Sequence, residues 1–280
     1  MNLLEKIAIN KKLEVEDRKT LFPVQLLEKS LYFETKAVSM KNYILRNDKS
    51  GIIAEFKRKS PSQGFINKLA DPAQITLEYM QAGASGLSVL TDNYYFGGNL
   101  NDLKDARNEN YCPILQKDFI INEYQIIEAK ASGADTILLI AAILTKKEIQ
   151  HFISIAHSLS MEVLLEIHSP EESGKITEEA DLLGINNRNL ETMKVNVQHS
   201  YDLISSFRKN FTCISESGIE DPRTLLELKQ AGFDGFLIGT GFMKSRNPGG
   251  ACKQFIRQYQ LLLQQKNKHS KNQSYEQVKN

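Results

Sequence analysis

Three segments of the chain share one pattern: AGASGLSVLT over 82–91, SGADTILLIA over 132–141 and AGFDGFLIGT over 231–240. In each segment a small residue and a glycine follow a helix-like stretch and lead directly into a short apolar run. Glycine takes positive φ without a Cβ clash and commonly follows the last residue of a helix. The pattern therefore predicts three helices that each end at a glycine and are followed at once by a strand.

The opposite joints, from strand to helix, carry signals that start helices. The predicted N-terminal caps are Asp71, Asn122, Thr145, Ser169 and Asp221. A proline follows each of the two aspartates, and Glu or Gln stands three residues after the other three caps, which is the spacing of a capping box. Strands and helices are thus expected to alternate along the chain.

Eight short apolar runs lie between these joints. They begin near Ile52, Leu87, Pro113, Ile137, Val163, Leu182, Cys213 and Phe236. The runs are too short for helices and too continuously apolar for a sheet with one wet face, so they indicate buried parallel strands. Eight such strands, spaced by roughly 20 to 35 residues, predict the α/β class and a single (β/α)8 TIM barrel. A doubly wound open sheet is the alternative.

The barrel domain is predicted over residues 49–265. Residues 1–48 precede the first strand and are expected to form a helical extension packed on the barrel, because apolar residues such as Leu3, Leu4 and Ile7 recur at helical spacings. The stretch from 266 to 280 is polar and is expected to be a disordered tail.

Composition excludes several classes of function. The 280 residues are 41% hydrophobic and 25% charged, with a net charge of +1, so nothing indicates binding to nucleic acid or to an anionic membrane. The three cysteines are far apart and form no metal motif, so neither a disulfide framework nor a metal is expected. The N-terminal segment lacks the apolar core of a signal peptide, and no run of about 18 apolar residues follows. A cytoplasmic protein is expected.

Polar residues recur where the predicted strands end. Glu55 and Lys57 are two residues apart in the first strand, so both side chains point the same way. The others, at the ends of later strands, are Lys117, Glu166, Asn186, Arg188, Glu216 and Ser217. An ion pair that plugs the barrel would explain any one of them. Their convergence at one rim predicts an active site instead, because that rim of a barrel is open to ligand.

The last two strands run into glycine-rich turns, at Gly218 and at Gly239-Thr240-Gly241. Backbone N–H groups can approach an anion closely at such turns, and in TIM barrels these two loops are the usual phosphate site. We therefore expect a phosphorylated small-molecule ligand.

Six segments, taken in order, resemble the motifs of the indole-3-glycerol-phosphate synthase family. They are IIAEFKRKSPSQGFI (52–66), LSVLTDNYYFGGNLNDL (87–103), PILQKDFIINEYQIIEAKASGADTILLIAAIL (113–144), LLGINNRNLETMKVN (182–196), ISESGI (214–219) and FLIGTGFM (236–243). The resemblance extends from about Leu3 to Gly249. One departure is Gln116, where the family often has Arg.

The resemblance implies a carboxy-lyase of tryptophan biosynthesis that needs no cofactor. Such an enzyme closes the pyrrole ring of 1-(2-carboxyphenylamino)-1-deoxyribulose 5-phosphate and releases carbon dioxide and water. Some relatives are fused to a second barrel, phosphoribosylanthranilate isomerase, for which this chain has no room, so a monofunctional enzyme is expected. Other tryptophan-pathway enzymes are candidate partners.

The resemblance also implies a role for each rim residue. Lys117 would be the general acid on the substrate's ketone oxygen, Glu166 the acid or base of the dehydration, and Lys57, oriented by Glu55, would act near the reacting chain and the phosphate. The remaining implied positions are Asn186, Arg188, Glu216, Ser217 and Ser60 at the anthranilate end, Gly218, Gly239 and Thr240 on the phosphate, and Phe96 and Phe119 as apolar walls.

Two other functions are compatible with barrel lysines at strand ends. One is an aldolase-like enzyme that forms a Schiff base through Lys57 or Lys117. The other is a protein that binds a phosphorylated ligand without catalysis.

Overall fold

Eight parallel strands close into a barrel in the computed structural model of the chain, which describes residues 3–189 and 194–277, with side chains as far as residue 266. The strands are β1 (Ile52–Phe56), β4 (Gly86–Leu90), β5 (Ile114–Lys117), β6 (Thr136–Ile140), β7 (Glu162–Ile167), β8 (Leu182–Asn186), β9 (Thr212–Glu216) and β10 (Gly235–Ile238). All eight predicted strands are confirmed. Because β1 pairs with both β4 and β10, the sheet has no edge and the open-sheet alternative is wrong.

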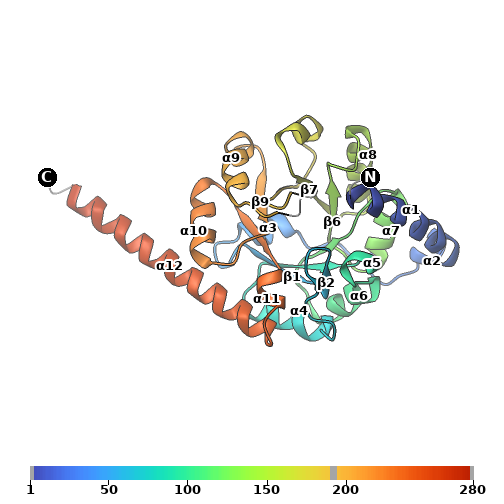
Figure 1. Cartoon of the computed structure of the whole chain (residues 1–280), viewed down its shortest axis with the longest axis horizontal. Helices are drawn as coiled ribbons and strands as arrows, with labels where there is room; N and C mark the ends of the chain where they lie inside the picture. Colours follow the sequence, from blue (N-terminus) through green and yellow to red (C-terminus); the bar gives the residue numbers. More distant parts are fainter. Residues whose placement is uncertain (1–2, 190–193, 278–280) are drawn as a thin grey trace.

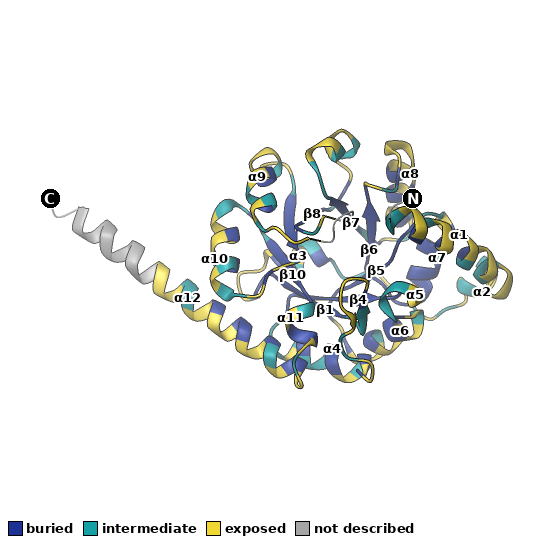
Figure 2. Ribbon diagram, in the orientation of Figure 1, coloured by how far each residue is buried: buried dark blue, intermediate teal, exposed yellow. Residues whose placement is uncertain are grey.

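Helices surround the barrel on the outside (Figure 1). They are α4 (Pro72–Gln81), α6 (Leu100–Glu109), α7 (Glu123–Ala131), α8 (Lys146–Ser158), α9 (Gln198–Phe207), α10 (Pro222–Ala231) and α12 (Pro248–Gln277). Figure 2 shows that the strands and the inward faces of these helices are buried, while the outward faces are exposed. No helix in the described part of the chain is long and apolar enough to cross a bilayer.

The helix ends formed largely as predicted. Gly83, Gly133 and Gly232 have φ values of +101°, +88° and +116°. The side chains of the predicted caps at the starts of α4, α7, α8 and α10 all accept hydrogen bonds from backbone N–H groups of the first turn. Local chemistry alone therefore accounts for where these helices begin and end.

The predicted capping box at Ser169 is wrong. The segment after it is a 3₁₀-helix, η1 (Pro170–Lys175), and Ser169 makes no capping hydrogen bond through its side chain. The Glu172 carboxylate instead accepts a hydrogen bond of 2.9 Å from the backbone N–H of His168. The carboxylate thus turns back toward the end of β7.

Two further differences concern short or polar segments. The loop after β1 contains a small antiparallel hairpin, β2 (Lys59–Ser60) and β3 (Gly64–Phe65), whose two-residue strands are too short for a periodic signal.

Helix α12 continues as far as Gln277, through most of the tail expected to be disordered. Lys, Gln and Glu are good helix formers, and extending an existing helix avoids the cost of nucleation.

The N-terminal extension consists of α1 (Leu3–Leu21), α2 (Val24–Leu27) and α3 (Met40–Leu45). Ile7, Lys11 and Val15 form one buried stripe on α1, four residues apart. Leu31, which follows α2, is 78% exposed. All three helices contact the barrel, because α1 and α2 pack against α7 and α3 contacts β4.

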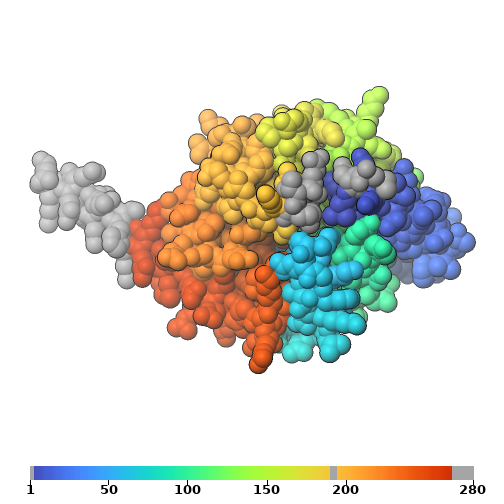
Figure 3. All heavy atoms as spheres, in the orientation of Figure 1, coloured from blue at the N-terminus to red at the C-terminus, as the bar shows by residue number. Residues whose placement is uncertain are grey.

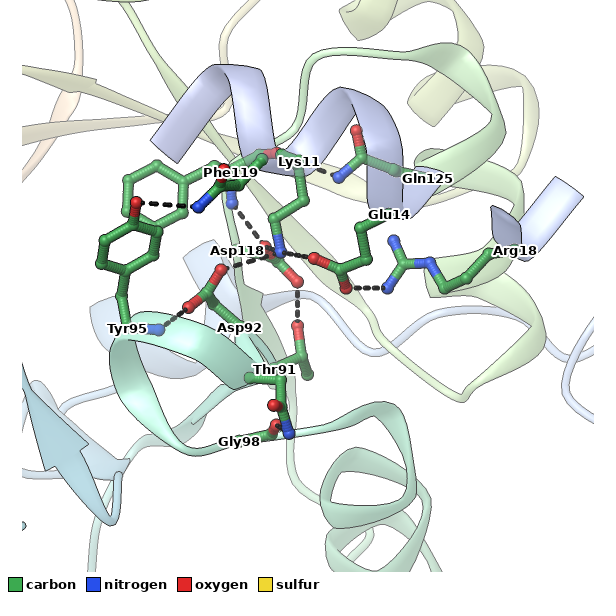
Figure 4. A network of polar contacts seen from close by, with 12 residues as sticks. Lys11, Glu14, Arg18, Thr91, Asp92, Tyr95, Gly98, Asp118, Phe119 and Gln125 are labelled. Atoms are coloured by element: carbon green, nitrogen blue, oxygen red, sulfur yellow. Dashed lines mark hydrogen bonds and ion pairs between the residues drawn. The ribbon is translucent and has the colours of Figure 1, made fainter. Parts of the chain in front are cut away.

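A buried lysine attaches α1 to the loops that follow β4 and β5 (Figure 4). The Lys11 Nζ lies 2.9 Å from a carboxylate oxygen of each of three acidic residues, Glu14, Asp92 and Asp118. Burial would lower the pKa of Lys11, but the carboxylates outweigh burial and raise it above its usual value. Lys11 is therefore a cation, and its removal would leave two buried aspartates without their counterion.

We predict that Lys11→Met lowers the free energy of unfolding by about 3 to 5 kcal/mol, the usual cost of removing one partner from a buried ion cluster. Lys19→Met is the matched control, since Lys19 pairs with Glu16 on the outer side of the same helix and should cost no more than about 1 kcal/mol. Urea denaturation of both variants gives the comparison. Equal losses in the two variants would contradict an anchoring role for Lys11.

Candidate active site

A cavity of about 560 Å³ opens at the carboxyl ends of the barrel strands. Every rim residue singled out in the sequence lines it: Glu55, Lys57, Ser60, Phe96, Lys117, Phe119, Glu166, Asn186, Arg188, Glu216, Ser217, Gly218, Gly239 and Thr240. Figure 3 looks onto this face, where the light-blue segment of β2 and β3 and the orange-red segment of α11 (Thr240–Met243) lie near the middle. Both segments contribute lining residues.

Two lysines and three glutamates converge at the base of the cavity. The Lys117 Nζ lies 3.1 Å from Glu166 Oε2 and 3.4 Å from Glu216 Oε2, so one ammonium joins the ends of β5, β7 and β9. The Lys57 Nζ lies 2.7 Å from Glu55 Oε1, as the two-residue spacing predicted. The three glutamates are at most 5% exposed.

The pKa values of the two glutamates that flank Lys117 are shifted in opposite directions. Burial would raise the pKa of Glu166, but Lys117 and His168 outweigh it, so its pKa lies well below the usual range. Burial and the charge of Glu166 together raise the pKa of Glu216 well above the usual range, and Lys117 offsets them only in part. Two carboxylates whose pKa values diverge in this way are suited to act as base and acid.

Lys117 itself is held as an ammonium. Burial would lower its pKa, but Glu166, Glu216 and Glu55 outweigh burial and raise it above its usual value. The side chain is 14% exposed and lines the cavity. It can thus present a positive charge, and a proton, to a ligand whose surroundings largely exclude water.

The turn after β9 has unusual backbone geometry. Ser217 has a φ of +70°, rare for a residue other than glycine, and Gly218 follows with +75°. The carbonyl of Ser217 accepts a hydrogen bond of 3.0 Å from the Asn187 side chain, which supports this conformation. A Cβ on Gly218 would overlap with Val195, so only glycine fits there.

Gly239, which follows β10, lies directly against the carboxylate of Glu55. A Cβ at this position would overlap with the Glu55 carboxylate, whereas a Cβ on the neighbouring Gly241 would meet nothing within 4 Å. Gly239 is therefore required for the position of Glu55 as well as for backbone access to a ligand.

Asn186 and Arg188 lie on the side of the cavity formed by β8. The Asn186 side chain accepts a hydrogen bond of 2.9 Å from the Arg188 backbone N–H, and the Arg188 Nη1 lies 3.5 Å from Ser62 Oγ in the loop after β1. The motif over 182–196 continues through residues 190–193, which lie outside the described part of the chain. An arginine here is suited to recognise a carboxylate.

Apolar side chains cover one wall. The rings of Phe96 and Phe119 have centroids 6.0 Å apart and line the cavity as predicted. Leu3, Leu4 and Ile7 of α1 also line it, although the sequence showed them only as part of a helical stripe. Their role depends on the long-range contact of α1 with the barrel mouth, for which the local sequence carries no signal.

Comparison with known proteins assigns the chain to a family. The family model described as "Indole-3-glycerol phosphate synthase" matches residues 4–255. Curated proteins of that name match almost end to end: the one from Bacteroides thetaiotaomicron is 45% identical, covering 92% of this chain and 99% of its own length, and one from Campylobacter jejuni is 38% identical, covering 91% and 100%.

The chain belongs to the indole-3-glycerol phosphate synthase family. It is therefore a decarboxylating lyase of tryptophan biosynthesis, and the resemblance inferred from the sequence is confirmed. Members of the indole-3-glycerol phosphate synthase family act on a phosphorylated small molecule, which agrees with the glycine-rich turns at one end of the cavity.

Solved structures support the barrel independently. A mutant tryptophan synthase alpha-subunit from Pyrococcus furiosus has a TM-score of 0.57 with 16% identity, covering 76% of this chain and 98% of its own. A thiamine phosphate pyrophosphorylase from the same organism has a TM-score of 0.57 with 15% identity, covering 79% and 99%. At such low identity the likeness concerns the fold alone.

We expect Gly239→Ala to lose about 10²-fold in kcat/KM, because its Cβ would push Glu55 away from Lys57, and a displacement of about 1 Å at a catalytic group costs this much. Gly174→Ala, at a glycine that does not line the cavity and has open space around the new methyl group, is the control. Steady-state kinetics on both variants provide the test. A Gly239→Ala enzyme as active as Gly174→Ala would show that the position of Glu55 is unimportant.

Proposed function

We propose that this indole-3-glycerol-phosphate synthase converts 1-(2-carboxyphenylamino)-1-deoxyribulose 5-phosphate into indole-3-glycerol phosphate, with Lys117 as the general acid. The observation that carries the proposal is the Lys117 ammonium, held between Glu166 and Glu216 and exposed to the cavity. No organic cofactor is needed, and among the described residues no group of three or more His, Cys, Asp and Glu side chains is arranged to hold a metal ion.

Ring closure requires a positive group at the ketone. The ring carbon that bears the carboxylate attacks the ketone carbon, and negative charge develops on the ketone oxygen. An ammonium at Lys117 neutralises that oxygen and transfers a proton to it, which gives a hydroxyl group. The neutral amine then lies between two carboxyl groups, of which Glu216, with its raised pKa, is the one able to supply a replacement proton.

Loss of carbon dioxide and of water completes the reaction. The C–CO₂ bond breaks and its electron pair restores the aromatic ring, so this step needs no external electron acceptor. Dehydration then needs a base to remove a proton and an acid to protonate the departing hydroxyl. Glu166 is the proposed base, because its lowered pKa keeps it ionised. Lys117 or Lys57 is the proposed acid.

The two ends of the substrate are assigned to two sets of residues that line the cavity. The phosphate is placed at the turns that follow β9 and β10, on Gly218, Gly239 and Thr240. The anthranilate end is placed against Ser60, Asn186, Arg188, Glu216 and Ser217, with Phe96 and Phe119 as the apolar walls. Lys57, oriented by Glu55, then lies near the reacting chain. The convergence of all these groups on one cavity supports the arrangement.

The charge of Lys117 argues against the aldolase-like alternative. A Schiff base forms from a neutral amine, and its lysine therefore needs a lowered pKa. The carboxylates around Lys117 raise its pKa instead. Borohydride treatment in the presence of substrate should accordingly trap no covalent adduct on Lys117.

The proposal extends to location and partners. We place the enzyme in the cytoplasm, where its phosphorylated substrate would be made and used, without nucleic acid or membrane partners. Other tryptophan-pathway enzymes remain the candidate protein partners.

Thr240→Val should raise KM for the substrate about tenfold with little change in kcat, because it removes a hydroxyl from the proposed phosphate site while keeping the shape of the side chain. Inorganic phosphate should inhibit the wild-type enzyme competitively and the variant more weakly. Steady-state kinetics measure both effects. An unchanged KM together with unchanged inhibition would show that the phosphate does not bind at this turn.

Lys117→Ala should lose roughly 10²-fold to 10⁴-fold or more in kcat while the substrate still binds, which is the usual scale for a general acid. Single-turnover rates and the melting temperature are measured on the same preparation, so that lost chemistry is distinguished from lost folding. A folded, nearly fully active Lys117→Ala enzyme would refute the mechanism.

A further inference from the structure

A buried histidine lies behind Glu166, on the side away from Lys117. His168 follows β7 directly, its side chain is 7% exposed, and it is not among the described residues that line the cavity. Its Nε2 lies 2.9 Å from Glu166 Oε1, while the other carboxylate oxygen, Oε2, lies 3.1 Å from the Lys117 Nζ. Each oxygen of Glu166 thus faces a different nitrogen.

A second carboxylate faces the other side of the imidazole. The His168 Nδ1 lies 3.7 Å from Glu172 Oε2, and the same Glu172 oxygen accepts the hydrogen bond from the His168 backbone N–H. This is the carboxylate that η1 turns toward β7 in place of capping its own helix. Burial would lower the pKa of His168, but Glu166 and Glu172 outweigh it and raise the pKa to about 9. The ring is therefore an imidazolium at neutral pH.

We propose that His168 is a positioning residue of the active site, which keeps Glu166 ionised and turned toward Lys117. The proposal rests on the proposed role of Glu166 as a base. It does not require His168 to touch the substrate.

The surrounding charges explain why a second cation is needed. Glu166 faces Lys117 from β5 and Glu216 from β9. The negative charge of Glu55, from β1, also acts on Lys117 and Glu216 and raises the pKa of both. Lys57 is engaged with Glu55. One ammonium, Lys117, is thus shared between Glu166 and Glu216, two buried carboxyl groups. The imidazolium lies beside Glu166 and favours its charged form. When the two carboxyl groups hold one proton between them, that proton therefore resides on Glu216.

The test is the pH profile of the single-turnover rate constant in His168→Gln. Glutamine keeps a hydrogen-bond donor but has no charge. Without the imidazolium, the charged form of Glu166 is less favoured and its pKa rises, so the acidic limb of the profile should move upward by about one pH unit or more. KM should stay near the wild-type value. His157→Gln is the matched control, since His157 Nε2 lies 2.9 Å from Asp181 Oδ2 at the surface, away from the cavity. Its profile should be unchanged.

His168→Asn is the second variant, in case His168→Gln does not fold. It also removes the positive charge beside Glu166, so the acidic limb should move in the same direction. An unshifted acidic limb in either folded variant, even with a lower melting temperature, would leave His168 a merely structural residue and overturn the inference. Failure of the wild-type enzyme to form indole-3-glycerol phosphate would instead refute the proposed function.

Discussion

The candidate active site depends on a cation buried among carboxyl groups. Taking the charges of Lys117 and Glu166 and the carboxyl group of Glu216 out of water is expensive, and such a cluster forms only where the backbone fixes its members close together. The closed barrel provides this, because the three residues end β5, β7 and β9 and their side chains point into the same interior. The energetic cost of burying these charges is then offset by their mutual attraction, and the same attraction sets their protonation states.

Two successive residues at the end of β5 pair with different partners. Lys117 pairs with Glu166 and Glu216 in the cavity, and Asp118, the first residue after the strand, pairs with the Lys11 ammonium of α1. The end of β5 thus carries both the charge of the candidate active site and the attachment of the N-terminal helix. Because α1 contributes Leu3 and Leu4 to the cavity wall, the attachment also shapes the site.

Periodic and local signals explain what was predictable from the sequence. The eight strands, the glycines that end helices and the polar residues at strand ends follow from patterns a few residues long, and the barrel then brings every candidate rim residue into one cavity. Lys11 could not be assigned, because its partner Asp118 is 107 positions away (118 minus 11) and a lysine on a helix usually faces water. His168 was missed for a different reason. Its neighbour Glu172 looked like part of a capping box, and the competing contact with His168 depends on the fold of the loop.

Space for the buried carboxylates comes from glycines on neighbouring strands. A Cβ on Gly184 in β8 would overlap with the Glu216 carboxylate, and a Cβ on Gly239 after β10 would overlap with that of Glu55. Both backbones therefore approach the acidic groups more closely than any other residue would allow. Gly184 lies in the middle of a fully buried strand, where glycine weakens packing and needs an explanation. The carboxylate it accommodates supplies one. The absence of a side chain at Gly184 and Gly239 thus lets Glu216 and Glu55 lie inside the barrel, close enough to the two lysines to interact with them.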